Sequence, residues 1–421
     1  MLLRSARIFL LGTLFAAPLA FGAVQPLVWG VLGIAVAFLL LLWAAGCALE
    51  KTIRVYWSPI YLPAVAFLAL AAVQYAGALT LDRAATKEAL CKLTTDLILF
   101  FLAGQLLAEA AEREWRKMGL AITLYTFAMG LFATLQFFSS HNLIYWAIRS
   151  PGYTFGPYVN HNHYAGLMEM LIPLAVAGAL PGIRKDASAV LLGFVALIPI
   201  ASLLLSGSRG GVVSLTIEVL VAASLIVLYA PRRSRKAASA VGALAVLAAA
   251  LLFFWMAPHQ ITERLSMIAD AVHSPEVAMA DRLAAARDSL RIFRDRPWVG
   301  SGLGSFETVF PKYQSFPSDS TWDHAHNDYA EALAETGAIG GALILFALGL
   351  FFWLAFRNLR ERLRYSAGRV RFGAALGCCG LLAHGFVDFN LHIPANGAWF
   401  AACAALATLR TPARPVDLAG Q

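Results

Sequence analysis

The chain has 421 residues, of which 59% are hydrophobic and only 14% are charged, and its formal net charge is +8. Soluble domains carry about a quarter charged residues, so this composition excludes a water-soluble globular protein. Basic and aromatic residues do not alternate on any polar domain, which excludes nucleic acid as a partner. We therefore predict an all-α polytopic membrane protein.

Apolar runs long enough to cross a bilayer recur along the whole chain. A helical crossing needs about 20 predominantly apolar residues, and the runs predict about twelve transmembrane helices. These lie near 6–22, 26–48, 58–78, 93–110, 118–138, 163–181, 187–205, 211–230, 238–257, 330–356, 372–389 and 396–409. The prediction divides the chain into spans 1–9 with short loops (1–257), one large external loop (258–329), and spans 10–12 with a C-terminal tail (330–421).

The basic residues indicate the orientation of these spans. Most Lys and Arg residues outside the long loop fall on the side that the N-terminus occupies. Short loops rich in Lys and Arg stay in the cytoplasm, so we predict both termini there and the 258–329 loop on the opposite side. Arg4 and Arg7 before the first apolar run also resemble the start of a signal peptide, although we expect this helix to be retained.

The long loop contains a helical pattern from Asp281 to Arg296, which Pro297 ends. Its apolar face is predicted to consist of Leu283, Ala286, Leu290 and Phe293. The same segment is rich in arginine and includes Arg282 and Arg287. Three glycines at 300, 302 and 304 then predict a turn rather than a nucleotide-binding loop, because no strand precedes them and their spacing does not fit.

Unusual polar residues gather at the external ends of the spans, where ionisable groups are costly to bury and usually mark a site. One cluster enters span six and contains Asn160, His161, His163 and Glu169. Another is the hairpin 206–211 with Arg209, a third is the arginine-rich loop helix, and a fourth runs from His324 to Glu335. A minor fifth cluster contains His384, Asp388, Asn390 and His392.

Arg209 lies in a short turn between two apolar spans, with glycines beside it that permit close backbone approach. A guanidinium offers five donors in a planar fork that matches phosphate oxygens. We interpret this turn as an anion site; the alternative is an arginine that extends to lipid headgroups.

The fourth cluster places His324, His326 and Asn327 where a polar loop enters span ten. On a helix, Asn327, Glu331 and Glu335 would share one face. Histidine gains and loses a proton near neutral pH, and a carboxylate beside it orients the ring. We predict a general base that removes a proton from a sugar hydroxyl, oriented by Asn327 or a nearby carboxylate; the alternative is interfacial histidines bonded to headgroups.

The sequence predicts no metal ion and no cofactor. Histidines spaced as HxH are weak evidence for a metal, and neither an HExxH motif nor a DxD motif is present. A Walker motif is also absent, so ATP is not the energy source. A solute transporter is the non-enzyme alternative, but it would place polar groups near the middle of the bilayer, and a scaffold protein would not need arginine in a tight external turn.

These motifs together resemble the O-antigen ligase and O-antigen polymerase superfamily. Ligases of that family carry a histidine, then Asn, Ser or Gln, nine residues, a glycine, two residues and a second glycine. The pattern is complete here at His326, Asn327, Gly337 and Gly340. The Ser-Arg-Gly hairpin at 208–210 and the arginine that leads the loop helix also match, and the likeness covers roughly residues 150–400.

The resemblance implies a glycosyltransferase that moves a glycan, the O-antigen, from undecaprenyl pyrophosphate to lipid A-core. It implies a multi-pass protein of the bacterial inner membrane with a periplasmic active site and no metal. The expected catalytic residues are His326, Arg209 and Arg282. The expected substrate-binding residues are His324, Asn327, Arg287, Asn160, His161, His163 and Glu335. An O-antigen or exopolysaccharide polymerase and a protein O-oligosaccharyltransferase of the same superfamily remain alternatives.

Overall fold

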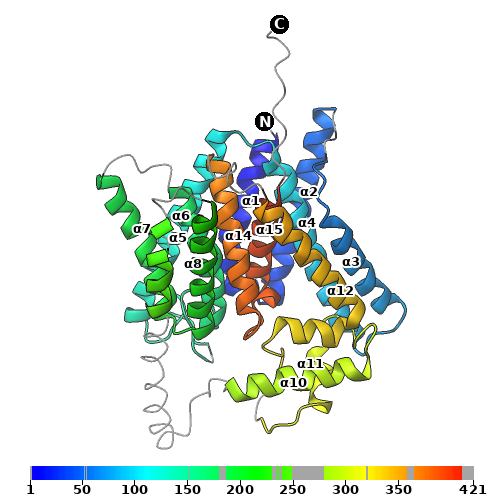
Figure 1. Ribbon diagram of the computed structural model, residues 1–421. Helices are drawn as coiled ribbons and strands as arrows, with labels where there is room; N and C mark the ends of the chain where they lie inside the picture. Colours follow the sequence, from blue (N-terminus) through cyan, green and yellow to red (C-terminus); the bar gives the residue numbers. More distant parts are fainter. Residues whose placement is uncertain are drawn as a thin grey trace, which may run out of the picture.

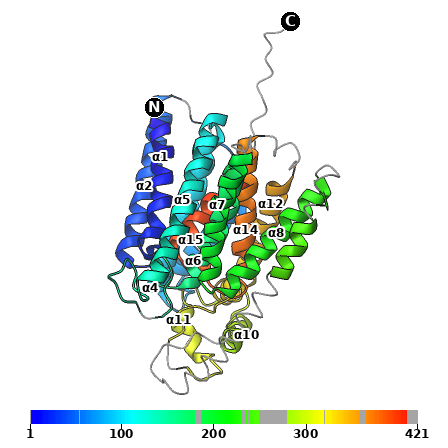
Figure 2. The ribbon, with the colours of Figure 1, turned by 90° about the vertical axis from the view of Figure 1, so that its left-hand side faces the viewer.

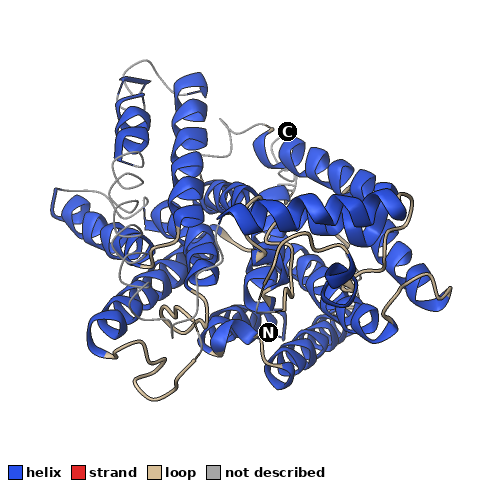
Figure 3. Cartoon of the chain, turned by 90° about the horizontal axis from the view of Figure 1, so that it is seen from below, coloured by secondary structure: helices blue, strands red, loops and turns tan. Residues whose placement is uncertain are grey.

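The computed structural model is a bundle of long helices with a smaller helical layer at one end (Figure 1), and its described elements are helices and loops (Figure 3). It describes residues 2–51, 53, 55–150, 152–179, 186–229, 235–236, 239–248, 279–318, 321–357 and 365–409. Within these ranges the chain forms helices and two isolated bridges but no strand. The predicted all-α class is therefore confirmed.

The helices follow the hydropathy of the sequence closely. They are α1 (Leu2–Leu19), η1 (Phe21–Ala23), α2 (Pro26–Leu49), α3 (Tyr61–Ala76), α4 (Arg83–Ala108), α5 (Glu112–Ser139), α6 (His161–Ala179), α7 (Asp186–Leu205), α8 (Arg209–Tyr229), α10 (Met279–Asp295), α11 (Phe306–Val309), η3 (Phe310–Lys312), α12 (Asp328–Phe356), α14 (Ser366–His384), η4 (Asn390–His392) and α15 (Pro394–Thr408).

Each of the twelve predicted spans coincides with helical structure. The ninth is seen only as the apolar helix Ser239–Ala248, because its remaining residues lie outside the described ranges. Among the described helices, six are long and apolar enough to cross a membrane: α1, α2, α4, α5, α8 and α12. Twelve crossings, like the sidedness of the loops, stay a prediction.

Helices α14 and α15 lie in the middle of the bundle, between α5–α8 on one side and α2–α4 on the other (Figures 1 and 2). Helix α14 packs against α6 and α8, and α15 packs against α4. Small residues permit this close packing: a Cβ at Gly373 would lie 2.5 Å from the Pro173 carbonyl oxygen, and one at Gly377 would lie 2.7 Å from Cα of Met170. The centre of the bundle is consequently tightly packed.

Helices α10 and α11 form a layer at the end of the bundle away from the start of α1 (Figure 1). This layer has its own small apolar core, separate from that of the bundle. Its buried members are Ala285, Ile292, Phe306, Val309, Phe310, Trp322, Ala325 and Ala334. Because Ala334 belongs to α12, this core docks the layer on the beginning of that helix.

The predicted loop helix is confirmed as α10, but its predicted apolar face is wrong. Leu283 is 65% exposed and Leu290 is 47% exposed, whereas Ala285 and Ile292 are buried. Small side chains let α10 approach its neighbours closely. The buried carboxylate of Asp288 accepts a hydrogen bond from the Ser315 backbone amide at 2.7 Å, which adds a polar anchor to this face.

Two glycines allow the loop layer and α12 to cross in backbone contact. Gly300 has φ +69°, and a Cβ there would lie 2.2 Å from the carbonyl carbon of Glu335. Gly337 has φ +64°, and a Cβ there would lie 2.4 Å from the carbonyl of Trp298. The Ala338 amide donates to the Pro297 carbonyl across the crossing at 2.7 Å. This glycine crossing, defined by Gly300 and Gly337, confirms the predicted turn and explains the first glycine of the motif.

Candidate functional site

The candidate site is built around the short turn between α14 and α15. Helix α14 ends at His384, five residues before the predicted end of that span at 389. Residues 385–389, called here the α14–α15 turn, lead into η4. Asn396 of α15 holds this region, because its amide donates to the Asn390 side chain at 3.0 Å and to the His163 carbonyl at 2.9 Å.

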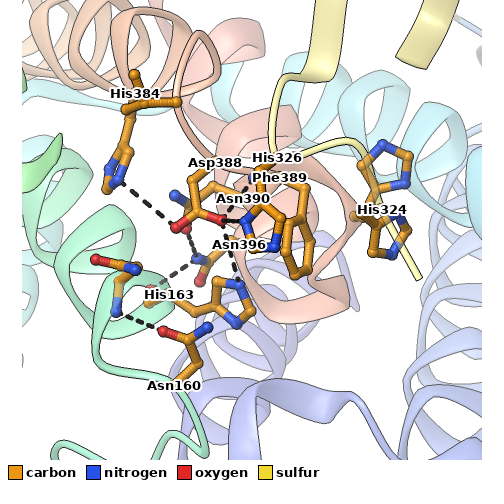
Figure 4. A network of polar contacts seen from close by, with 12 residues as sticks. Asn160, His163, His324, His326, His384, Asp388, Phe389, Asn390 and Asn396 are labelled. Atoms are coloured by element: carbon orange, nitrogen blue, oxygen red, sulfur yellow. Dashed lines mark hydrogen bonds and ion pairs between the residues drawn. The ribbon is translucent and has the colours of Figure 1, made fainter. Parts of the chain in front are cut away.

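Asp388 is a fully buried carboxylate in the middle of this turn. Its Oδ1 lies 3.4 Å from Nδ1 of His326 and 3.9 Å from Nε2 of His163, and its Oδ2 lies 4.0 Å from Nε2 of His384 (Figure 4). The three imidazoles come from the loop before α12, from α6 and from α14. Segments far apart in the sequence thus meet at one acidic group.

The surroundings of Asp388 favour its ionised form. Burial alone would raise the pKa of this carboxyl, but the contact with His326 and the charges of the histidines and Arg282 outweigh it. The pKa of Asp388 is therefore lowered below its ordinary range. An ionised carboxylate at this position can orient the His326 ring and stabilise it in the protonated form.

His326 is held firmly on its other sides. Its ring centroid lies 5.4 Å from that of Trp322 and 4.8 Å from that of Phe389, both in edge-to-face contact. The backbone of His326 has φ +49°, a left-handed conformation that is uncommon for residues other than glycine. Such conformations cluster at functional sites, where the surrounding structure imposes them.

Arg282 contacts the α14–α15 turn, and the residue after Arg209 packs against the same region. Nη1 of Arg282 donates to the Val387 carbonyl at 2.9 Å, while its buried Nε has no partner in the described part of the chain. Arg209 begins α8, and a Cβ on the next residue, Gly210, would lie 2.4 Å from Nε2 of His384. The close backbone approach predicted at Gly210 is confirmed, but the group that approaches the backbone is the His384 side chain rather than an anion.

His384 also forms a buried pair with Glu169. Its Nδ1 lies 2.8 Å from Oε1 of Glu169 on α6, and both side chains are almost completely buried. This contact fixes the ring so that the opposite nitrogen faces Asp388.

Three of the predicted substrate-binding residues make structural contacts in this structure. Oδ1 of Asn160 accepts from the Asn162 amide at 2.8 Å at the start of α6. Nδ1 of His161 lies 2.8 Å from the Ser206 carbonyl oxygen and ties α6 to the hairpin before α8. Oδ1 of Asn327 accepts from two backbone amides and caps α12, while its amide donates to the Phe386 carbonyl at 2.9 Å. Asn327 therefore lies outside the helical face on which the sequence predicted it.

Glu335 and Arg287 also lie apart from Asp388. The carboxylate of Glu335 accepts from the backbone amides of Gly304 at 2.8 Å and Phe306 at 2.9 Å, which anchors the loop layer. Arg287 is exposed on α10, about 140° around the helix axis from Arg282. A substrate contact at Arg287 stays a prediction.

His324 belongs to a second polar cluster beside the first. Its Nδ1 lies 2.7 Å from Oε1 of Glu331, and Nε2 of His392 lies 3.5 Å from the same oxygen and 3.5 Å from Oδ1 of Asp328. Burial would lower the pKa of His324, but the charge of Glu331 and its hydrogen bond raise it to about 9. The Phe389 ring contacts both clusters, because its centroid lies 4.4 Å from that of His324 and 4.8 Å from that of His326.

An apolar cavity of about 620 Å³ opens next to the second cluster. It lies between α2, α3, α4, α12 and α15, and its apolar wall includes Phe67, Phe100 and Phe351. His324, Asp328 and His392 line its polar part. The shape and chemistry suit an amphiphile with a long apolar chain.

Sequence reasoning placed Asp388 and His392 in a minor cluster and missed their importance. The signal was the regular spacing of His384, Asp388 and His392, four residues apart in an otherwise apolar region. The partners that make this spacing meaningful, His326 and Glu331, lie more than 50 residues earlier.

The fold and site together define a helical membrane protein with an Asp–His–Arg centre where the loop layer meets the bundle. Residues 194–345 match the family model described as O-antigen ligase, and this segment contains Arg209, Arg282 and His326. The predicted resemblance to the O-antigen ligase and polymerase superfamily is thereby confirmed over that segment. Members of the family are membrane enzymes of the glycosyltransferase kind. No curated protein matches the chain in sequence.

Proposed function

We propose that this protein transfers a glycan from undecaprenyl pyrophosphate to lipid A-core at the periplasmic face of the bacterial inner membrane. One observation carries the proposal: an imidazole oriented by a buried carboxylate meets two arginine-bearing segments at the α14–α15 turn. A general base beside cationic phosphate clamps is what a pyrophosphate-linked sugar donor requires.

The arginines bind the donor. Arg282 uses one nitrogen to fix itself to the Val387 carbonyl, which leaves further donors of its planar fork for phosphate oxygens. Arg209 supplies a second guanidinium from the start of α8. Positive charge held in place before the reaction stabilises the negative charge that develops on the departing pyrophosphate.

His326 activates the acceptor. With Nδ1 turned toward Asp388, its Nε2 accepts the proton of the acceptor hydroxyl. The hydroxyl oxygen then forms a bond to the anomeric carbon, and the bond from that carbon to the pyrophosphate oxygen breaks. A single displacement of this kind inverts the anomeric centre. Asp388 stabilises the imidazolium until the proton leaves, and the Phe389 backbone amide holds the carboxylate in place by donating to its Oδ1 at 2.9 Å.

The apolar cavity supports a lipid-linked substrate. Its phenylalanine-rich wall fits an acyl or isoprenoid chain, and its polar part lies against the Phe389 ring that borders His326. A glycan attached to a lipid in this cavity is thus led toward the imidazole.

The test uses the purified full-length chain with a glycan on undecaprenyl pyrophosphate and with lipid A-core. A general base contributes about 10²–10⁴-fold to a rate, so His326→Ala is expected to lose that factor while the protein still folds. The matched control is His141→Ala, because His141 is an exposed histidine in an external loop and carries no role in the site. Wild-type transfer by His326→Ala would overturn the assignment.

Deletion of the gene separates the related activities. Loss of all long-chain glycan from lipid A-core supports a ligase. Core carrying a single repeat unit indicates a polymerase, and unchanged lipid with altered proteins indicates a protein transferase. Unchanged surface glycans and glycoproteins would contradict glycan transfer altogether and favour the transporter.

A further inference from the structure

The second polar cluster brings three potential metal ligands together. One ligand atom each from His324, Glu331 and His392 lies within 4.8 Å of the other two. Oδ1 of Asp328 lies 3.5 Å from the same nitrogen of His392. Two of these residues belong to the start of α12, one precedes it, and one belongs to η4.

The position of His392 relative to the two carboxylates matches the ligand spacing of tetrahedral coordination. Zn²⁺ binds His nitrogen and carboxylate oxygen at about 2.0–2.2 Å, so ligand atoms at tetrahedral corners are about 3.3–3.6 Å apart. Nε2 of His392 lies 3.5 Å from the ligand oxygens of Glu331 and of Asp328. The pair formed by His324 and Glu331 is closer, at 2.7 Å, and has to open by less than 1 Å to admit an ion.

Asp328 supplies independent evidence that a ligand is needed. The side chain is 7% exposed, and neither carboxylate oxygen accepts a hydrogen bond of standard geometry in the described part of the chain, although the Leu391 amide faces it. A buried carboxylate without partners is costly. Glu331, at 1% exposure, brings a second carboxylate to the same place. A divalent cation would balance both charges.

We propose that His324, Glu331 and His392 bind a divalent transition-metal ion of the Zn²⁺ type, with the Asp328 carboxylate beside them. Two imidazoles with two carboxylates favour such an ion over Mg²⁺ or Ca²⁺, which prefer oxygen ligands alone. The polar part of the apolar cavity, lined by three of the four residues, gives the ion a route to the site.

The ion would join two segments that position the transfer site. His324 and Glu331 flank His326 in the chain, and His392 follows Asp388 by four residues. The metal therefore ties the loop that carries the imidazole to the turn that carries its carboxylate. Its ligand His324 contacts the same Phe389 ring as His326, so we assign the ion a positioning role.

The experiment measures metal binding in the full-length chain, purified in detergent without a polyhistidine tag. After stripping with chelator and reloading with Zn²⁺, the wild-type protein is expected to retain one equivalent by elemental analysis. His392→Gln is expected to lose it, and His141→Gln, the exposed control, is expected to keep it. Because no glycan substrate is present, the outcome is independent of the proposed transfer activity.

Replacement of Zn²⁺ by Co²⁺ provides a second readout that misfolding of a variant does not explain. The intense visible absorption of tetrahedral Co²⁺ is expected with the wild type and with His141→Gln, and not with Glu331→Gln. The competing explanation is a proton shared between His324 and Glu331. In that case the wild type and His392→Gln would retain equal amounts of zinc. Co²⁺ added to the wild type would also keep the pale spectrum of its hydrated form. Either result would overturn the proposal.

Discussion

Replacement of Gly337 by alanine tests whether the glycine crossing positions the site. Gly337 interrupts α12 with φ +64° and ψ −165°, a region that is essentially restricted to glycine. Holding another residue there costs about 1–3 kcal/mol. The new Cβ would also lie 2.4 Å from the Trp298 carbonyl, which is backbone and cannot move aside as a flexible side chain would.

Relief of that overlap adds about 1–3 kcal/mol, the usual cost of overpacking a tight site. The total of about 2–6 kcal/mol is a large fraction of the 5–15 kcal/mol that typically separates folded from unfolded protein. The measurement is thermal unfolding of the purified chain, followed by tryptophan fluorescence, together with transfer activity below the unfolding midpoint. We expect a lower midpoint and a loss of activity, since the crossing holds the loop layer beside His326.

The control is Gly349→Ala on the same helix, where a Cβ would meet nothing within 4 Å. Alanine in a helix interior is about 0.5–1 kcal/mol more favourable than glycine, so this variant is expected to match or exceed the wild-type midpoint. Equal midpoints for the two alanine variants would refute the steric argument.

Three further outcomes are expected. Asp388→Asn should lower the transfer rate by about 10²-fold or more, because the amide no longer stabilises the imidazolium of His326; an initial rate equal to wild type would contradict this role. Arg282→Lys should raise the KM for the donor, because lysine keeps the charge but loses the planar fork, and an equal effect of the exposed control Arg294→Lys would count against a specific clamp. His161→Ala should lower stability by about 1–3 kcal/mol by leaving the buried Ser206 carbonyl without this partner, and an unchanged unfolding midpoint would exclude that contribution.

The helices were predictable because the bilayer constrains them so strongly. Runs of apolar residues must satisfy their own backbone hydrogen bonds in lipid, so hydropathy alone identifies most of them. Their ends were less predictable where polar side chains decide them. Helix α4 begins at Arg83 rather than near 93, because Asp82 caps it by accepting from the Ala85 amide at 3.0 Å.

The contacts within the site could not be predicted from the sequence, because they join residues that are distant in the chain. The importance of His326 was visible in a local motif, but its contact with Asp388 spans 62 residues of sequence and depends on how α12 and α14 pack. Local periodicity failed similarly on α10, where Ala285, Ser289 and Ile292 rather than the leucines face the protein. Asn327 was expected on a helical face with Glu331, but its side chain caps the helix instead.

The loop layer has an apolar core of its own, so the molecule consists of two separately packed parts. The α14–α15 turn lies between buried helices. A substitution there would shift Asp388 relative to His326, so this part of the molecule tolerates few substitutions. The layer that contains α10 and α11 packs around Phe306, Phe310 and Trp322, but it also carries Arg282 and crosses α12 at Gly300. Chimaeras that exchange other residues of 279–318 and keep Arg282 and Gly300 would therefore test whether this layer selects the glycan of the proposed transfer reaction.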